Sequence, residues 1–173
     1  MSDPGVYVRQ EGRGSSITDY LPLFSLTLVS VLAGLAISSG GAELSMTTFM
    51  HGFMGVFLVI FALLKIFNLK GFRRGFTMYD LLARKVRNYA LVYPFIELGL
   101  GLGYLAFFQP VIIYWVTIVV FVFGTLGVLS ALRRGLDIDC PCMGSILSVP
   151  LSTVTLTEDL AMVAMAAMLL LNW

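Results

Sequence analysis

Residues 111–132 have the sequence VIIYWVTIVVFVFGTLGVLSAL, which contains no charged side chain. As an α-helix rising 1.5 Å per residue, this stretch would be about 33 Å long. That length matches the hydrocarbon core of a bilayer, which is roughly 30 Å thick. We therefore predict a transmembrane helix over residues 111–132.

The rest of the chain shares this apolar character. Of its 173 residues, 58% are hydrophobic and 12% are charged, and the mean hydropathy is +0.92. Soluble domains contain about 25% charged residues, and a domain this small exposes too much surface to bury so many apolar side chains in water. The composition excludes a soluble globular domain and a disordered chain. The net charge of +1 gives no reason to expect a nucleic acid as partner.

Four other stretches are candidate spans. Together with residues 111–132, the five candidate spans are residues 20–38, 46–67, 89–108, 111–132 and 156–173. Gln109-Pro110 separates the third from the fourth, because proline removes a backbone donor. The last would be about 27 Å long, just enough to cross. We predict an all-α, polytopic transmembrane bundle of four to five spans, forming one membrane domain at 20–173 behind a polar cytoplasmic tail at 1–19.

The basic residues support this count of spans. With five spans, all eleven fall on one side of the membrane: Arg9, Arg13, Lys65, Lys70, Arg73, Arg74, Arg84, Lys85, Arg87, Arg133 and Arg134. Lysine and arginine gather in the cytoplasmic loops of membrane proteins. The distribution predicts a cytoplasmic amino terminus and a carboxyl end on the outer side.

Residues 69–88 differ from the spans. Their apolar side chains recur every three or four residues, with cations between them, and are Phe72, Phe76, Tyr79, Leu82 and Val86. We predict an amphipathic segment in the cytoplasmic interface that directs its cations toward anionic lipids. A binding site for a soluble partner is the alternative.

The sharpest local motif is Cys140-Pro141-Cys142-Met143-Gly144, between the fourth and fifth spans. Cys140 and Cys142 are candidate catalytic residues of a redox-active dithiol, whose disulfide would be strained and comparatively oxidising. With Met143, the same thiolates could instead bind a soft metal ion, Cu(I), or Zn if other ligands join. A third hypothesis is that both cysteines only pack a loop. The motif falls on the cytoplasmic side, where thiols are normally reduced.

Glu97 is the only carboxylate deep inside a predicted span, and an intramembrane carboxylate usually faces the interior of its bundle. Lys65, near the cytoplasmic end of the second span, is its expected partner. The buried polar pair Lys65–Glu97 would act as a proton or cation relay. The alternatives are a structural ion pair and a protonated, hydrogen-bonded carboxyl group at Glu97.

Methionines form two rows at helical spacing. The outer row is Met46, Met50 and Met54 with His51 beside it, and the second row is Met162, Met165 and Met168. Thioethers in such rows could pass Cu(I) inward, although methionines in an apolar chain more often fill gaps in packing.

Glycines and acids in the later spans have structural interpretations. Gly99, Gly101, Gly103, Gly124 and Gly127 would let helices approach closely. Glu158 and Asp159 are expected to open the last helix, where acids complement the helix dipole and need no further role.

Several motifs together point to a family. A lysine ends a helix at Lys65, a Gly-Phe-basic stretch begins at Gly71, and a Pro-Phe-Ile-Glu-Leu sequence runs from Pro94 to Leu98. A Cys-x-Cys-x-Gly motif follows one helix later. In this combination, residues 46–173 resemble the methylamine-utilisation MauE family, within the wider DoxX-like group of small membrane proteins.

The resemblance implies a four- or five-helix bundle in the bacterial inner membrane, with a role in maturing a periplasmic enzyme that has many disulfides. We therefore expect a membrane accessory protein with a thiol-redox or protein-maturation role and a thioredoxin-like partner. The alternatives are a Cu(I)-handling membrane protein and a non-catalytic accessory subunit of a larger membrane complex. The sequence has no phosphate loop, HExxH or dinucleotide-binding motif.

Overall fold

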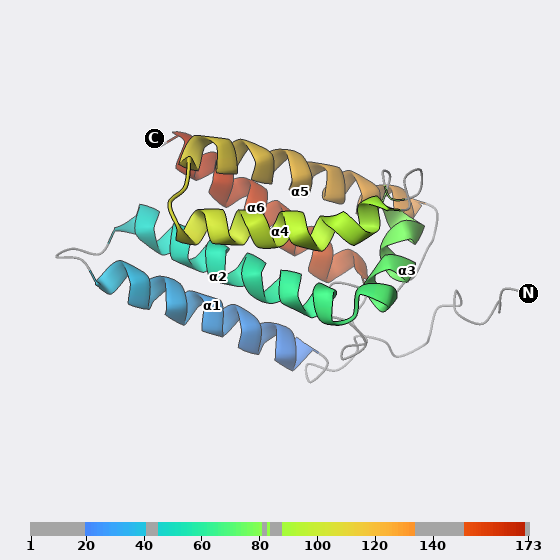
Figure 1. The fold of residues 1–173 in the computed structure, drawn as a ribbon, viewed down its shortest axis with the longest axis horizontal. Helices are drawn as coiled ribbons and strands as arrows, with labels where there is room; N and C mark the ends of the chain where they lie inside the picture. Colours follow the sequence, from blue (N-terminus) through green and yellow to red (C-terminus); the bar gives the residue numbers. More distant parts are fainter. Residues whose placement is uncertain (1–19, 41–44, 81–82, 84–87, 134–150, 172–173) are drawn as a thin grey trace, which may run out of the picture.

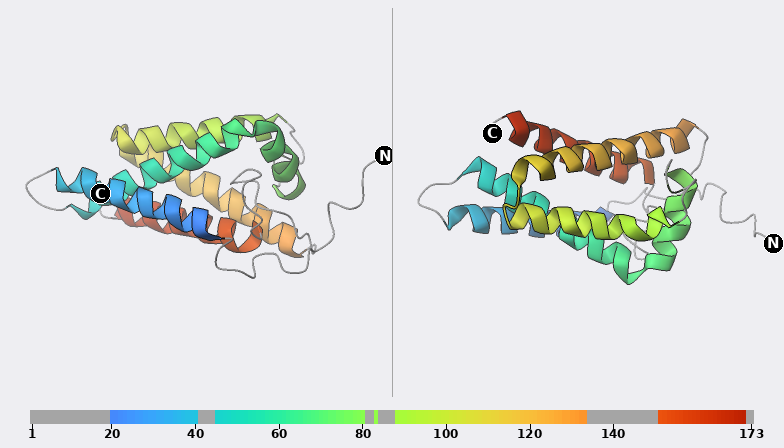
Figure 2. Two further views of the ribbon diagram at one scale, coloured as in Figure 1. Left: turned by 90° about the horizontal axis from the view of Figure 1, so that it is seen from below. Right: turned by 45° about the horizontal axis from the view of Figure 1, so that its top comes forward.

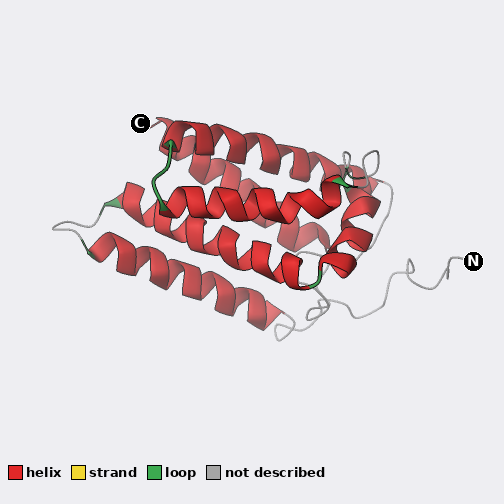
Figure 3. Ribbon diagram, viewed as in Figure 1, coloured by secondary structure: helices red, strands yellow, loops and turns green. Residues whose placement is uncertain are grey.

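The computed structural model describes residues 20–40, 45–80, 83, 88–133 and 151–171. These residues form six α-helices and no strand (Figure 1, Figure 3). The helices are α1 (Leu21–Ser39), α2 (Met46–Phe67), α3 (Leu69–Tyr79), α4 (Tyr89–Leu105), α5 (Pro110–Arg133) and α6 (Leu151–Leu171).

Three of these helices, α1, α2 and α5, are long and apolar enough to cross a membrane. The apolar helix α4 is shorter, with 17 residues, and would be a fourth. The predicted all-α transmembrane fold is therefore confirmed, with three or four helices able to span. The 21 residues of α6 would measure about 31 Å, and its role as a fifth span stays a prediction.

The helices form one bundle in which α2 lies between α1 and α4, and α5 pairs with α6. Figure 2 shows the same pairing of α5 and α6 from two further directions. The end of α2, the start of α4, the end of α5 and the start of α6 all lie at the end of the bundle that carries α3 (Figure 1). We call this the α3 end. The described basic residues Lys65, Lys70, Arg73, Arg74 and Arg133 belong to the elements that meet there.

Local sequence explains the sharp corner between α2 and α3. Asn68 leaves the helical conformation (φ −125°, ψ 52°), and its side chain accepts a hydrogen bond from the Gly71 backbone N–H at 3.2 Å. A side-chain cap of this kind satisfies a backbone donor at the start of a helix. The corner turns α3 across the end of the bundle.

The amphipathic segment is present as α3, but its apolar face packs on protein. Phe72 and Phe76 are 1% and 2% exposed, and the Phe76 ring lies 4.6 Å from that of Tyr93 on α4. Arg74, on the other face, is exposed. The helix therefore covers the end of the bundle with its aromatic side. Leu82 and Val86 lie outside the described residues, as does the side chain of Tyr79.

Two glycines allow α2 and α4 to touch backbone to backbone. A Cβ atom added to Gly101 would lie 2.9 Å from the Gly55 carbonyl oxygen and 2.9 Å from the Val59 backbone nitrogen. Small residues at such crossings are common where membrane helices pack. Gly99 is different, because a Cβ there would meet no atom within 4 Å. The expectation that Gly99 serves close packing is wrong, since it lies on the exposed side of α4.

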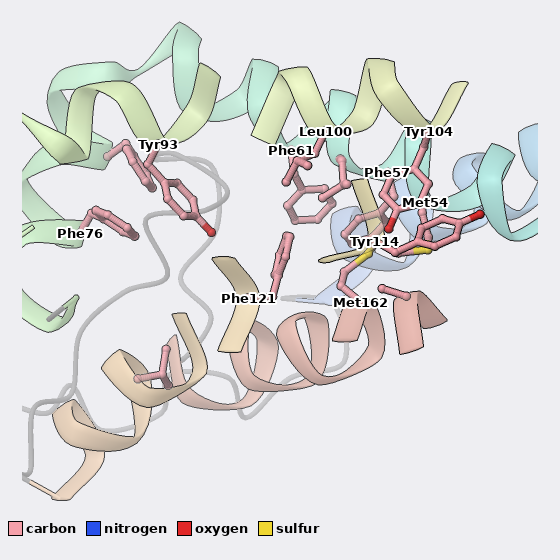
Figure 4. Close-up of a cluster of buried hydrophobic side chains, with 14 of the residues drawn as sticks. Met54, Phe57, Phe61, Phe76, Tyr93, Leu100, Tyr104, Tyr114, Phe121 and Met162 are labelled. Atoms are coloured by element: carbon pink, nitrogen blue, oxygen red, sulfur yellow. The ribbon is translucent and has the colours of Figure 1, made fainter. Parts of the chain in front are cut away.

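Aromatic and aliphatic side chains fill the space between α2, α4, α5 and α6. The largest buried ones include Met54, Phe61, Tyr104, Tyr114, Phe121 and Met162 (Figure 4). Large apolar side chains also point outward, among them Phe24, Leu28, Ile112, Trp115 and Phe123. Exposed apolar surface on this scale fits helices that face lipid rather than water.

Candidate functional site

The centre of the candidate site is an ion pair inside the bundle. Lys65, in the last turn of α2, places its Nζ atom 2.5 Å from both carboxylate oxygens of Glu97 on α4. The side chains are 3% and 0% exposed. Pro94 lies three residues before Glu97 inside α4. The charges of a pair this deeply buried must be balanced within the protein, because neither side chain is exposed to bulk solvent.

Aromatic rings enclose the ammonium group. Its Nζ atom lies 5.9 Å from the centre of the Phe72 ring on α3 and 5.4 Å from that of Tyr93 on α4. The negative faces of aromatic rings attract cations at this range. The aromatic side of α3 therefore shields the Lys65–Glu97 pair at the α3 end.

Two acids of α6 join this pair, which the sequence did not predict. Because α6 begins at Leu151 and not near residue 156, Glu158 and Asp159 lie in its third turn. They are 8% and 3% exposed. The expectation that they only open the helix is wrong, since no acid lies in the first turn of α6.

A cavity of about 10 Å³ separates α6 from Lys65, close to the room that one water molecule needs. Its lining residues come from five helices and are Lys65, Phe72, Phe76, Tyr93, Gly124, Thr155, Glu158 and Asp159. The cavity lies at the α3 end, and its lining includes Lys65 and three residues of α6. We call Lys65, Glu97 and Asp159, with this cavity, the intramembrane polar cluster.

Within this cluster, Asp159 has charged neighbours, but one of its carboxyl oxygens has no hydrogen-bond partner among the described residues. Thr125 of α5 neighbours its carboxyl group, and the charges of Lys65, Glu97 and Asp80 act on it. The Oδ2 atom of Asp159 is buried without a hydrogen-bond partner among the described residues. A Cβ atom on Gly124 would lie 2.9 Å from Oδ2. Gly124 therefore makes room for the carboxyl group.

A second polar network surrounds His51, near the other end of α2. Nδ1 of His51 donates a hydrogen bond to the Tyr104 carbonyl oxygen at 3.0 Å, so Nε2 accepts from the Tyr114 hydroxyl at 2.5 Å. The Tyr104 hydroxyl donates to Thr117 at 3.1 Å. The Phe107 ring stacks on the imidazole at 4.3 Å, and Phe107 itself has a left-handed backbone (φ 51°). Both ring nitrogens of His51 are thus engaged.

The methionines of the two rows differ in burial, since some are exposed on the surface of the bundle and others lie in its core. Met46 is 66% exposed, while Met54 and Met162 are 0% and 1% exposed and belong to the core. With both nitrogens of His51 already bonded, the geometry favours packing over metal transfer for the outer row. Among the described residues, no three His, Cys, Asp or Glu side chains lie close enough to hold a metal ion.

We expect Tyr114→Phe to lower the free energy of unfolding by about 1 kcal/mol, because it leaves Nε2 of His51 buried without its donor. Chemical denaturation in lipid-detergent micelles measures this change. Tyr20→Phe is the control, since Tyr20 is only half buried. Equal stability of Tyr114→Phe and the unchanged protein would contradict the assigned hydrogen bond.

The candidate residues Cys140, Cys142 and Met143 lie outside the described residues. The segment that carries them joins Arg133 at the end of α5 to Leu151 at the start of α6, so both its attachment points lie at the α3 end. The sequence did not indicate that Asp159, Thr125 and Tyr114 belong to polar networks. The signal of Thr125 and Tyr114 was weak, because a threonine or tyrosine in an apolar span is compatible with many environments.

Comparison with known proteins places the chain in a protein family. The model of a family described as methylamine utilisation protein MauE matches residues 23–172. No curated protein and no solved structure matches the chain.

Proposed function

Since the chain belongs to the MauE family and is a multi-pass membrane protein, we propose that it is an accessory protein for thiol redox chemistry or protein maturation. Cys140 and Cys142 are the proposed redox pair. One thiolate attacks a disulfide sulfur of a thioredoxin-like partner and forms a mixed disulfide. The second thiolate displaces the partner, which leaves reduced while Cys140 and Cys142 become oxidised.

One observation supports this proposal more than any other. The segment with both cysteines is attached at the α3 end, where the next residues of α6 contribute Thr155, Glu158 and Asp159 to the polar cavity. Thiol–disulfide exchange depends on the fraction of thiol that is deprotonated. An acid and an ammonium group close to the attachment points suit chemistry that takes up and releases protons.

We propose the same orientation that the basic residues predicted. The α3 end faces the cytoplasm of a bacterial cell, with the amino terminus on that side of the inner membrane. Lys70 and Arg74 of α3 are exposed, while Phe72 and Phe76 are buried. This arrangement leaves cations at the surface, where anionic lipid headgroups attract them.

Thiol labelling in native membranes tests the redox proposal. We expect Cys140 and Cys142 to react with a maleimide reagent after reduction and to resist it after mild oxidation. Cys142→Ser should accumulate a mixed disulfide between Cys140 and the partner, because the second thiol that would displace the partner is absent. The Cys140→Ser, Cys142→Ser double variant is the matched control and should form none.

Elemental analysis of the same purified protein separates the alternatives. Copper or zinc that is lost in the double cysteine variant would replace the redox proposal with soft-metal handling. Labelling that does not respond to oxidation, without bound metal but with stoichiometric copurification of a larger assembly, would identify a non-catalytic subunit.

A further inference from the structure

We propose that Asp159 is the proton-binding residue of a site inside the membrane domain, which Lys65 and Glu97 complete. The ligand is a single proton on the Asp159 carboxyl group, which exchanges through the cavity at the α3 end. This inference rests on the geometry of the described helices and is independent of the redox proposal.

The first support is the position of one oxygen atom. Asp159 is 3% exposed, and its Oδ2 atom has no hydrogen-bond partner among the described residues while it faces the space that Gly124 leaves open. An ionised carboxylate with an unsatisfied oxygen is costly in a low-dielectric interior. A proton on this group removes the charge, and a water molecule in the adjoining cavity would satisfy the oxygen.

The second support is how the neighbouring charges are engaged. Lys65 directs its ammonium group to both oxygens of Glu97 at 2.5 Å, and its positive charge also attracts Asp159. Glu97 and Asp80 add negative potential at Asp159. Among the described residues that line the cavity, the other polar side chains are Tyr93 on α4, and Thr155 and Glu158 on α6. Within this described lining, the Lys65 ammonium group faces more than one carboxyl group, and a proton supplies further positive charge.

The size of the cavity favours a proton over a metal cation. A volume of about 10 Å³ admits one water molecule, whereas Na⁺, Mg²⁺ or Ca²⁺ would need a shell of oxygen ligands. The Lys65 ammonium group lines the same cavity and repels a second cation. When the proton leaves, the O–H bond of Asp159 breaks and the proton passes to the cavity water. The ionised Asp159 then competes with Glu97 for Lys65.

Infrared difference spectroscopy of the full-length protein in lipid tests this assignment. We expect a carboxylic-acid C=O band at neutral pH that is lost at alkaline pH. The band should move to lower frequency when the protein is made with aspartate labelled isotopically at its side-chain carboxyl carbon. This measurement needs no substitution, so it holds even if a variant does not fold.

Two matched variants then identify the residue. Asp159→Asn should lose the band, whereas Asp80→Asn should keep it, because Asp80 already accepts a hydrogen bond from the Ala83 N–H at 2.7 Å. The inference is overturned if no carboxylic-acid band exists at neutral pH or if the label leaves it unmoved. It is also overturned if the band disappears in Asp80→Asn but survives in Asp159→Asn.

Discussion

Lys65→Met should lower the free energy of unfolding by about 3–5 kcal/mol. Methionine keeps the length and apolar stem of lysine but removes the ammonium group that contacts both oxygens of Glu97. Glu97 is fully buried, so its carboxylate would stay desolvated without its counter-charge. Reversible denaturation in lipid-detergent micelles measures the loss, and a fall in the yield of folded protein would accompany it.

A double variant separates the ion pair from simple packing. Glu97→Gln alone should also destabilise the protein, because it leaves the ammonium group uncompensated. Lys65→Met with Glu97→Gln should recover most of the combined loss, since partners in direct contact do not contribute independently. Strictly additive losses, or a Lys65→Met variant as stable as the unchanged protein, would show that the pair does not hold the bundle together.

Gly101→Ala should lower the free energy of unfolding by about 2 kcal/mol, although alanine is the better helix former. The added Cβ would lie 2.9 Å from backbone atoms of α2, and backbone cannot move aside as a flexible side chain can. The two helices would have to separate at their closest contact. Thermal unfolding in micelles should show a lower Tm than for the unchanged protein.

Gly99→Ala is the matched control, two residues away on the same helix. Its Cβ would meet no atom within 4 Å, so we expect the stability to stay the same or to rise slightly from the gain in helix propensity. A Gly99→Ala variant that is as destabilised as Gly101→Ala would contradict the backbone contact between α2 and α4.

The transmembrane helices were predictable because their signal is carried by composition. An uncharged run such as residues 111–132 identifies a span without knowledge of its neighbours, and α5 covers it with one residue more at each end. The boundary at residue 108 was wrong, since α4 ends at Leu105. Phe107 and Gln109 adopt left-handed backbone conformations in the connection that follows, which residue type alone does not indicate.

The candidate site was predictable only in part, because it depends on contacts between distant segments. The Lys65–Glu97 pair could be predicted, because Glu97 is a lone carboxylate in an apolar span and few cations lie near the spans. Asp159 was expected to lie in the first turn of the last helix. Because α6 begins at Leu151, five residues before the predicted start, Asp159 lies further along the helix, where it lines the cavity. The surroundings of α3 were equally hidden, because an amphipathic pattern fits either lipid headgroups or protein.

Labelling of cysteines from each side of the membrane tests the central claim, that the dithiol segment and the α3 end share one face. The probe is a membrane-impermeant maleimide applied to right-side-out and inverted vesicles. The native Cys140 and Cys142 are compared with Arg74→Cys on α3 and Ser39→Cys at the end of α1, both introduced without the native cysteines. Residues 74 and 39 are exposed at opposite ends of the bundle.

We predict that Cys140, Cys142 and the cysteine at position 74 react only in inverted vesicles, and the cysteine at position 39 only in right-side-out vesicles. Reaction of the native cysteines from the same side as position 39 would contradict the account, because it would separate the dithiol from the intramembrane polar cluster.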